Sequence, residues 1–171
     1  MSVLISDCQR QVCAFTLGNH LFGIDVRHVQ EVFRFQEYTP VPLTPPLVRG
    51  LLNLRGQIVL AIDLRLRLGL QERSGDESPI SIVVNTDEGV MSFLVDELFD
   101  IMNLDKAQFE ATPDTLSDSE KRFVSGCFKL DDRLLIMLEA DQIADISGLL
   151  LETLEEARGE RMIPNPISGF R

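Results

Sequence analysis

The sequence predicts a mainly β protein in which one plan of short strands and short helices is used twice. Two observations carry this prediction: short apolar runs alternate with tight-turn residues, and two separate stretches of the first half recur, in the same order, in the second half. Short antiparallel strands at this spacing favour small barrels or a sandwich over a parallel sheet with long crossover helices.

The longer repeat aligns residues 48–63, VRGLLNLRGQIVLAID, with residues 124–139, VSGCFKLDDRLLIMLE, without a gap. Gly50 meets Gly126, and apolar residues meet apolar residues along both strands. Each copy therefore reads as a hairpin. The predicted turns are Arg55-Gly56 in the first copy and Asp131-Asp132 in the second, and glycine and aspartate tolerate the positive φ angles that two-residue hairpins require.

The acid that ends each copy of this repeat is predicted to cap a short helix. Asp63 precedes residues 64–68, and Glu139 precedes residues 140–146. A carboxylate at this position can accept a hydrogen bond from the first free N–H groups of a helix.

Each of these hairpins is preceded by another, over residues 12–24 with the turn Gly18-Asn19 and over residues 80–95 with a turn through 86–89. A helical stretch is expected after each, at residues 26–32 and 97–102. In the first of these, Val26, Val29 and Val32 recur at a spacing that fits one helix face. We expect each half to bury its strands in its own core and to leave a groove between two lobes.

The connecting segments divide the chain. Residues 38–46 contain four prolines and are excluded from a central strand. The polar residues 71–78 separate the halves, and residues 113–120 form another polar connection. We therefore expect one two-lobed domain over residues 11–148. The tail, residues 149–171, is helix-permissive at first and is expected to fray after Gly159.

The net charge and its distribution along the chain limit the kinds of partner. The net charge of −11 is unfavourable for nucleic acid, whose binding needs cations that neutralise phosphates. Five arginines nevertheless lie between Arg49 and Arg73, against two acids. This asymmetry predicts a contact surface for an acidic partner, although charge alone favours an ordinary solvated face. No apolar run is long enough to span a bilayer, and residues 1–8 do not resemble a secretory signal.

Catalytic chemistry has no positive signal. His20 and His28 have no sequence-local metal-ligating partners, and the three cysteines show no paired spacing, which favours structural thiols in a reducing compartment. The motifs of serine nucleophiles, P-loops and dinucleotide sites are missing. We therefore expect no enzyme activity, no cofactor and no metal.

A binding pattern is present instead. Val29 and Val32 flank Glu31 on one short element, and Arg55 stands at a hairpin tip. Apolar residues near a guanidinium form a good anchor for a partner helix. The alternative is that the valines belong to the core and Arg55 is an ordinary turn residue, and the residues alone leave the two readings equal.

These residues resemble the signatures of CheW-like domains. Phe22-Gly23-Ile24-Asp25-Val26, leading into Val29-Gln30-Glu31-Val32, resembles the first signature, and residues 48–59 followed by Ile62-Asp63-Leu64-Arg65 resemble the second and most specific one. Val95-Asp96 with Ile101 matches a third, weaker stretch. The resemblance covers residues 11–146, and the tail has no counterpart in the pattern.

The resemblance implies two intertwined, five-stranded SH3-like barrels and a cytoplasmic, non-enzymatic scaffold. Its implied partners are the cytoplasmic tip of a chemoreceptor, lying in the groove between the lobes, and the regulatory domain of a CheA-type histidine kinase. The residues that it implicates in partner binding are Val29, Glu31, Val32, Gly50, Asn53, Arg55 and Gly56, and Arg55 is the one expected to make a direct polar contact.

Two alternatives remain open at this stage. The same adaptor fold also serves non-flagellar pathways, such as pilus motility or biofilm signalling, and the sequence does not separate these from chemotaxis. An enzyme or small-ligand sensor that uses the groove between the lobes is supported only by the abundance of carboxylates.

Overall fold

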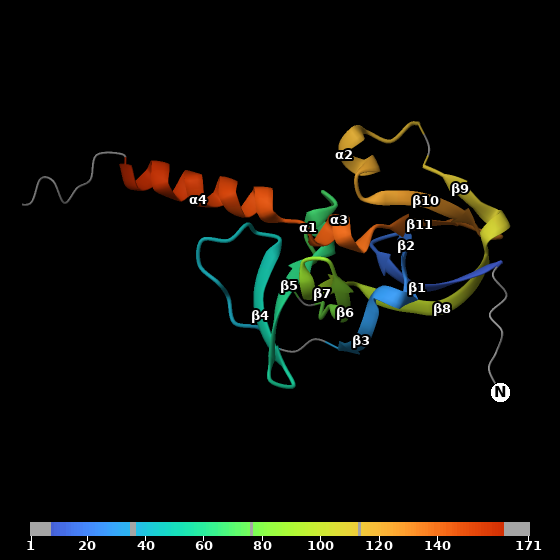
Figure 1. Cartoon of the computed structure of the whole chain (residues 1–171), viewed down its shortest axis with the longest axis horizontal. Coiled ribbons are helices and arrows are strands. Elements are labelled where there is room, and N and C mark those ends of the chain that lie inside the picture. Colours follow the sequence, from blue (N-terminus) through green and yellow to red (C-terminus); the bar gives the residue numbers. More distant parts are fainter. Residues whose placement is uncertain (1–7, 35–36, 76, 113, 163–171) are drawn as a thin grey trace, which may run out of the picture.

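A computed structural model describes residues 8–34, 37–75, 77–112 and 114–162, and it places the strands in two sheets that pack against each other (Figure 1). The first sheet contains β1 (Gln9–Leu17), β2 (His20–Asp25), β8 (Glu97–Asp105), β9 (Phe109–Ala111), β10 (Val124–Lys129) and β11 (Leu134–Leu138). The second contains β3 (Val29–Arg34), β4 (Val48–Leu54), β5 (Gln57–Asp63), β6 (Ile80–Thr86) and β7 (Gly89–Val95). The predicted mainly β fold is confirmed.

All four predicted hairpins are present. β1–β2 turns at Gly18-Asn19, β6–β7 between Thr86 and Gly89, β4–β5 at Arg55-Gly56, and β10–β11 between Lys129 and Leu134. Arg55 and Gly56 have φ angles of 52° and 84°, as the turn of a two-residue hairpin requires. Asp131 and Asp132 do not adopt positive φ. Their turn instead closes through the N–H of Leu130, which donates to the carbonyl of Arg133 at 2.9 Å.

The expectation that each half of the chain encloses its own core is wrong. The strand order is β8-β1-β2-β11-β10-β9 in the first sheet and β3-β6-β7-β5-β4 in the second. Each sheet therefore takes one hairpin from the first half of the chain and one from the second. Parallel pairing of β2 with β11, and of β5 with β7, joins the exchanged hairpins. The intertwined arrangement agrees with what the family resemblance implies.

The helix expected over residues 26–32 is wrong. A single 3-10 turn, η1 (Val26–His28), is followed by the strand β3. A bulge between Val29 and Glu31 inserts one extra residue into the pairing with β6. Because of this bulge, Val29 and Val32, three positions apart, both pack against the core from an extended strand. A helical spacing thus arises without a helix.

The helix expected over residues 97–102 is also wrong. These residues begin the long strand β8, which pairs with β1 and carries a bulge of its own opposite Ala14 and Phe15. β8 is an edge strand of the first sheet, and most of its side chains face solvent. Because β8 has almost no buried face, its sequence lacks the alternation of apolar and polar residues that predicts a strand.

The largest hydrophobic cluster lies between the two sheets. Cys13, Phe15 and Ile24 from the first sheet pack there with Ile62 and Phe93 from the second. A smaller cluster on the opposite face of each sheet fills the interior of each lobe, around Phe128 in the first and around Leu52 and Val59 in the second. Exchange of hairpins and a shared core make the two lobes one folding unit.

Short helices close the ends of the strands. α1 (Leu64–Arg67) is capped as predicted, because the Asp63 carboxylate accepts from the N–H of Arg65 at 3.0 Å. α3 (Ala140–Ala144) lacks the predicted side-chain cap from Glu139. The polar connection over residues 113–120 leads into α2 (Asp118–Lys121), which begins with a capping box between Ser117 and Glu120.

The last described element, α4 (Ser147–Met162), extends away from the two sheets (Figure 1). Leu149 and Leu150 in its first turn pack against the shared core. The fraying expected after Gly159 is not seen up to Met162, where α4 is still helical. The rest of that stretch, residues 163–171, lies outside the described residues. None of the described helices is long and apolar enough to cross a membrane.

Candidate functional site

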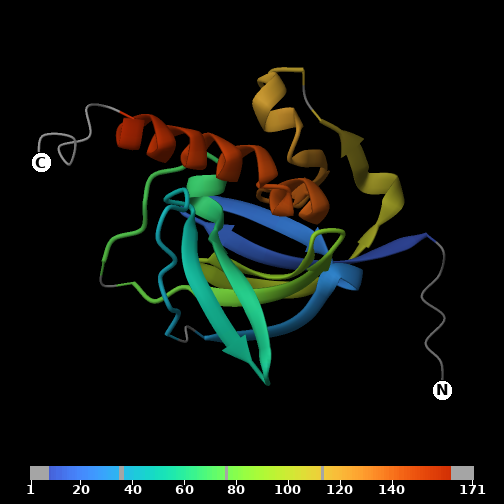
Figure 2. The same cartoon turned by 60° about the vertical axis from the view of Figure 1, so that its left-hand side comes forward.

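The β4–β5 hairpin projects from the second sheet (Figure 2). Leu54 pairs with Gln57, so Arg55 stands at the tip of the hairpin. The left-handed conformation of Arg55 directs the side chain away from the core, and 80% of it is exposed. Its Nη2 donates to Oε1 of Glu31 at 3.0 Å. The ion pair keeps the guanidinium positioned while most of it remains accessible to a partner.

Glu31 lies on β3, at the opposite edge of the same sheet. In the order β3-β6-β7-β5-β4, the strands β3 and β4 are the two edges. The sheet curls so far that residues at its two edges come within ion-pair distance, as in a nearly closed barrel. Sequence reasoning placed Glu31 and Arg55 in one site without predicting that they contact each other.

Two further predicted residues shape the hairpin tip. The Asn53 side chain accepts a hydrogen bond from the N–H of Gly56 at 3.0 Å, which fixes the turn. Opposite Asn53 across the hairpin is Ile58, with 61% of its surface exposed. Sequence reasoning missed Ile58 as part of this surface. Its alternation with the buried Val59 is the signal that would have pointed it outward.

The other three predicted site residues are not part of this exposed surface. Val29 and Val32 are half-buried and pack against the shared core. Gly50 is buried with φ at 147°, and an added Cβ would lie 2.8 Å from the carbonyl carbon of Thr39. The accessible polar surface thus consists of Glu31, Asn53, Arg55 and Gly56.

The expectation of a basic contact face between Arg49 and Arg73 is wrong for every arginine except Arg55. Arg49 binds Asp63 and Glu72, and Arg65 and Arg73 both bind Asp96. The fifth, Arg67, is buried and donates to backbone carbonyls of the α3 region. Arg49, Arg65 and Arg73 cross-link strand ends to the 71–78 connection. Arg67 joins α1 to the α3 region, so none of the four forms an open basic face.

The acids in these networks have lowered pKa values. Burial raises the pKa of Asp25, but hydrogen bonds and charge from Arg27, with the charge of Arg10, outweigh it and lower the pKa from 3.8 to about 2. Burial likewise raises the pKa of Asp96, but hydrogen bonds from Arg65, the Gly18 N–H and Arg73 have the opposite and larger effect. The pKa of Asp96 is therefore lowered overall. Both carboxylates therefore stay ionised in mildly acidic solution.

These pKa shifts predict acid lability. The unfolded chain takes up protons on Asp25 and Asp96 before the folded chain does, so the unfolding free energy should be constant above pH about 5 and fall between pH about 5 and about 2. Asp25 should contribute about 1 to 2 kcal/mol, reduced because Arg27 is exposed. Urea unfolding at a series of pH values measures the slope. Asp96→Asn should flatten it, and an unchanged slope in that variant would contradict the assignment.

One histidine and two cysteines considered as candidate ligands have structural surroundings. His28 Nδ1 lies 3.0 Å from the carbonyl oxygen of Asn85. Cys13 and Cys127 are buried as predicted, and burial raises the pKa of the Cys13 thiol to about 11. Within the described part of the chain, no group of three or more His, Cys, Asp and Glu side chains is arranged to hold a metal ion.

Two packed sheets that exchange hairpins define the architecture of this protein, and comparison with known proteins identifies its family. The model of the CheW-like domain matches residues 11–147. The chain belongs to this family.

Individual relatives agree with the family assignment. The chain is 34% identical over 137 residues to the chemotaxis protein CheW of Klebsiella aerogenes, covering 80% of this chain and 82% of that one. It is 30% identical over 148 residues to a probable chemotaxis protein CheW of Rhizobium etli, covering 86% and 92%. The structure of the scaffolding protein TtCheW from Thermoanaerobacter tengcongensis superposes with a TM-score of 0.74 at 28% identity, covering 81% and 94%.

The chain is accordingly an adaptor of chemosensory signalling. Its relatives carry chemotaxis names, and these favour chemotaxis over the pilus or biofilm alternative.

Proposed function

We propose that this adaptor joins the cytoplasmic tip of a chemoreceptor to the regulatory domain of a CheA-type histidine kinase, in the cytoplasm and without catalysis of its own. The observation that carries the proposal is the hairpin tip, where Arg55 is exposed yet held by Glu31 at 3.0 Å. A guanidinium that is already positioned loses little freedom when it binds a carboxylate or a carbonyl on a partner.

The surface around Arg55 has the composition of a small binding hot spot. Ile58 supplies exposed apolar area, Asn53 and Gly56 fix the turn, and Glu31 adds a carboxylate. Val29 and Val32 anchor the strand that carries Glu31 to the shared core. Arginine with adjoining apolar area is typical of hot spots, which carry most of the energy of an interface.

The two lobes present different hairpin tips. Arg55-Gly56 in one lobe corresponds to Asp131-Asp132 in the other, and 76% of the Asp132 side chain is exposed. Opposite charges at equivalent tips fit two different partners, as a connector requires. Each contact can be weak, because an assembled array raises the effective concentration of the partners.

The test is receptor-dependent activation of the kinase by purified components. Arg55→Ala should lower activation by about tenfold or more, the effect expected from loss of one hot-spot side chain. Alanine carries a Cβ as arginine does, so the positive φ is no more strained in the variant. Arg158→Ala, on the exposed surface of α4 and away from both hairpin tips, is the matched control. Full activation by Arg55→Ala would overturn the proposal.

A further inference from the structure

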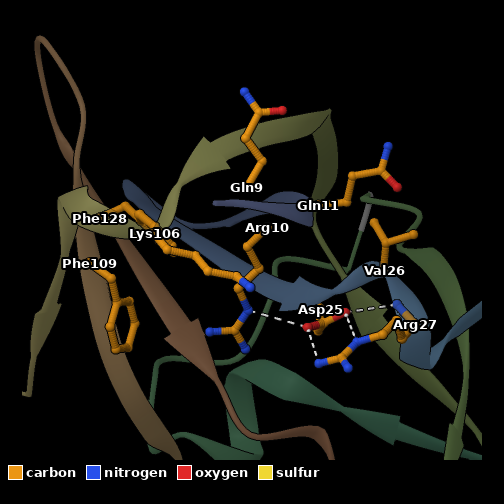
Figure 3. Close-up of a pocket in the computed structure, with 9 residues that line it drawn as sticks. All are labelled: Gln9, Arg10, Gln11, Asp25, Val26, Arg27, Lys106, Phe109 and Phe128. Atoms are coloured by element: carbon orange, nitrogen blue, oxygen red, sulfur yellow. Dashed lines mark hydrogen bonds and ion pairs between the residues drawn. The ribbon is translucent and has the colours of Figure 1, made fainter. Parts of the chain in front are cut away.

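A pocket of about 650 Å³ opens at the end of the first sheet, where the start of β1 meets η1 and the 3-10 turn η2 (Lys106–Gln108) (Figure 3). Three cations, Arg10, Arg27 and Lys106, line it against a single carboxylate, Asp25. The chain as a whole carries a net charge of −11. A pocket lined by more cations than carboxylates attracts anions, even on a chain whose net charge is negative.

Arg10 is positioned to bind a ligand. Its Nε donates to Oδ2 of Asp25 at 3.2 Å, and its guanidinium carbon lies 5.8 Å from the centre of the Phe109 ring. Among the described residues, neither terminal nitrogen of Arg10 has a hydrogen-bond acceptor. Only 26% of the side chain is exposed. A half-buried guanidinium with both terminal nitrogens available matches the two oxygens of a carboxylate.

Asp25 does not neutralise this cation by itself. Both of its oxygens are occupied by Arg27, whose Nε and Nη2 donate to Oδ1 and Oδ2 at 3.0 and 2.9 Å. The N–H of Arg27 also donates to Oδ1, at 2.9 Å. Asp25 therefore orients Arg10 through one bond while its own charge is balanced by Arg27, so Asp25 does not balance the charge of Arg10 (Figure 3).

The rest of the lining restricts the ligand. Phe109 presents apolar surface beside the guanidinium of Arg10, and Val26 presents apolar surface on the other side of the pocket (Figure 3). A bare inorganic anion leaves this surface in contact with water, whereas a carboxylate joined to an apolar group covers it. A volume of about 650 Å³ holds more than one side chain. These properties fit a short acidic peptide in which an apolar residue adjoins the carboxylate.

We propose that this pocket is a second docking site of the adaptor, in which Arg10 binds the carboxylate of an acidic segment of a protein partner and Phe109 and Val26 contact the apolar neighbours on either side of that carboxylate. The pocket lies on the first sheet, whereas the Arg55 hairpin belongs to the second. Occupation of one site therefore leaves the other accessible. The proposal rests on the role of the chain as an adaptor, but not on Arg55 being a partner contact.

The test uses the isolated chain and two blocked tripeptides, acetyl-Phe-Glu-Phe-amide and its glutamine counterpart, followed by two-dimensional ¹H–¹⁵N NMR. The glutamate peptide should shift the Arg10 Nε–H and Phe109 amide signals to saturation. The glutamine peptide should bind at least fivefold more weakly, because it lacks the charge. Equal affinity for the two peptides, or shifts spread over the whole surface, would overturn the proposal.

Variants of Arg10 distinguish two contributions to peptide binding: the positive charge, and the forked pair of terminal nitrogens that can bind both oxygens of a carboxylate. Arg10→Gln should weaken binding of the glutamate peptide at least fivefold, and Arg10→Lys should weaken it less, because lysine keeps the charge but loses the fork. Arg133→Gln is the matched control, because Arg133 also stacks on an aromatic ring, with its guanidinium carbon 5.3 Å from the centre of the Phe99 ring, but does not line the pocket. Undiminished binding by Arg10→Gln, in a variant whose spectrum shows an intact fold, would contradict the assignment.

Inorganic phosphate distinguishes the source of the anion. Phosphate should bind more weakly than the glutamate peptide, and equal or tighter binding of phosphate would show a site for free oxyanions instead. Arg55→Ala should leave peptide binding unchanged. Because neither receptor nor kinase is present in this experiment, failure of the proposed docking site and failure of the proposed coupling function give different results.

Discussion

Gly50→Ala is expected to lower the unfolding free energy by about 3 kcal/mol, from backbone strain and lost hydrogen bonds. A methyl group there would collide with the carbonyl oxygen of Thr39, and the φ angle of 147° is one that residues with a Cβ rarely adopt. Relief of the collision would break the paired bonds between Thr39 and Leu51, whose N···O distances are 2.9 and 2.8 Å. Urea unfolding followed by far-ultraviolet circular dichroism measures the loss.

The internal duplication supplies a second instance of this prediction and a control. Gly126 occupies the matching position in β10, has φ at 158°, and would collide with the carbonyl oxygen of Glu110 and the ring of Phe109. Gly126→Ala should therefore destabilise the chain to a similar extent. Gly148→Ala, in the first turn of α4 with no atom near the added methyl, should be neutral or stabilise by up to about 1 kcal/mol. Equal stability of all three variants would disprove the steric explanation.

Arg67→Met is expected to destabilise the chain by about 3 kcal/mol, because backbone acceptors near the end of α3 would lose their donors. Arg67 Nε donates to the carbonyl of Ile143 at 3.0 Å, and Nη2 donates to those of Gln142 and Asp145 at 3.2 and 2.9 Å. Its guanidinium carbon also lies 4.6 Å from the centre of the Phe123 ring.

The size of this effect follows from the position of Arg67 in the fold. α1 follows the second sheet and α3 follows the first, so the side chain joins the two lobes directly. Burial is the main influence on the pKa of Arg67 and lowers it. Burial of the charged guanidinium is therefore unfavourable unless its hydrogen bonds are kept. Arg158→Met, on the exposed surface of α4, is the matched control and should change the unfolding free energy by less than about 0.5 kcal/mol. A loss in Arg67→Met no larger than that of the control would refute the role of this contact.

The candidate site could be predicted only in part. The turn at Arg55-Gly56 depends on neighbours in sequence, and so does the cap of α1 by Asp63, and both were predicted correctly. The ion pair of Arg55 with Glu31 joins opposite edges of a curled sheet, and no sequence periodicity reports such a contact. The same limit explains Arg65 and Arg73. Their common partner, Asp96, lies at the end of a different hairpin.

A chance similarity of spacing explains why a helix was wrongly predicted over residues 26–32. Val29 and Val32 are three residues apart, which is the spacing of a helix face, but the bulge in β3 lets both reach the core from a strand. A bulge is defined by two strands together, and a single strand does not encode it. β8 illustrates the converse case, because an exposed edge strand has no buried face to give it a pattern.

The sequence by itself determined the four hairpins, the internal duplication, the exposed turn at Arg55 and the family resemblance. These features depend on residues close together in the chain or on positions that two copies share. The tertiary structure alone decided which hairpins share a sheet, that four of the five arginines between Arg49 and Arg73 turn inward, and that Arg10 faces a cationic pocket. The physical reason is that an edge of a strand accepts any compatible neighbour, and burial of the shared core selects the one that forms.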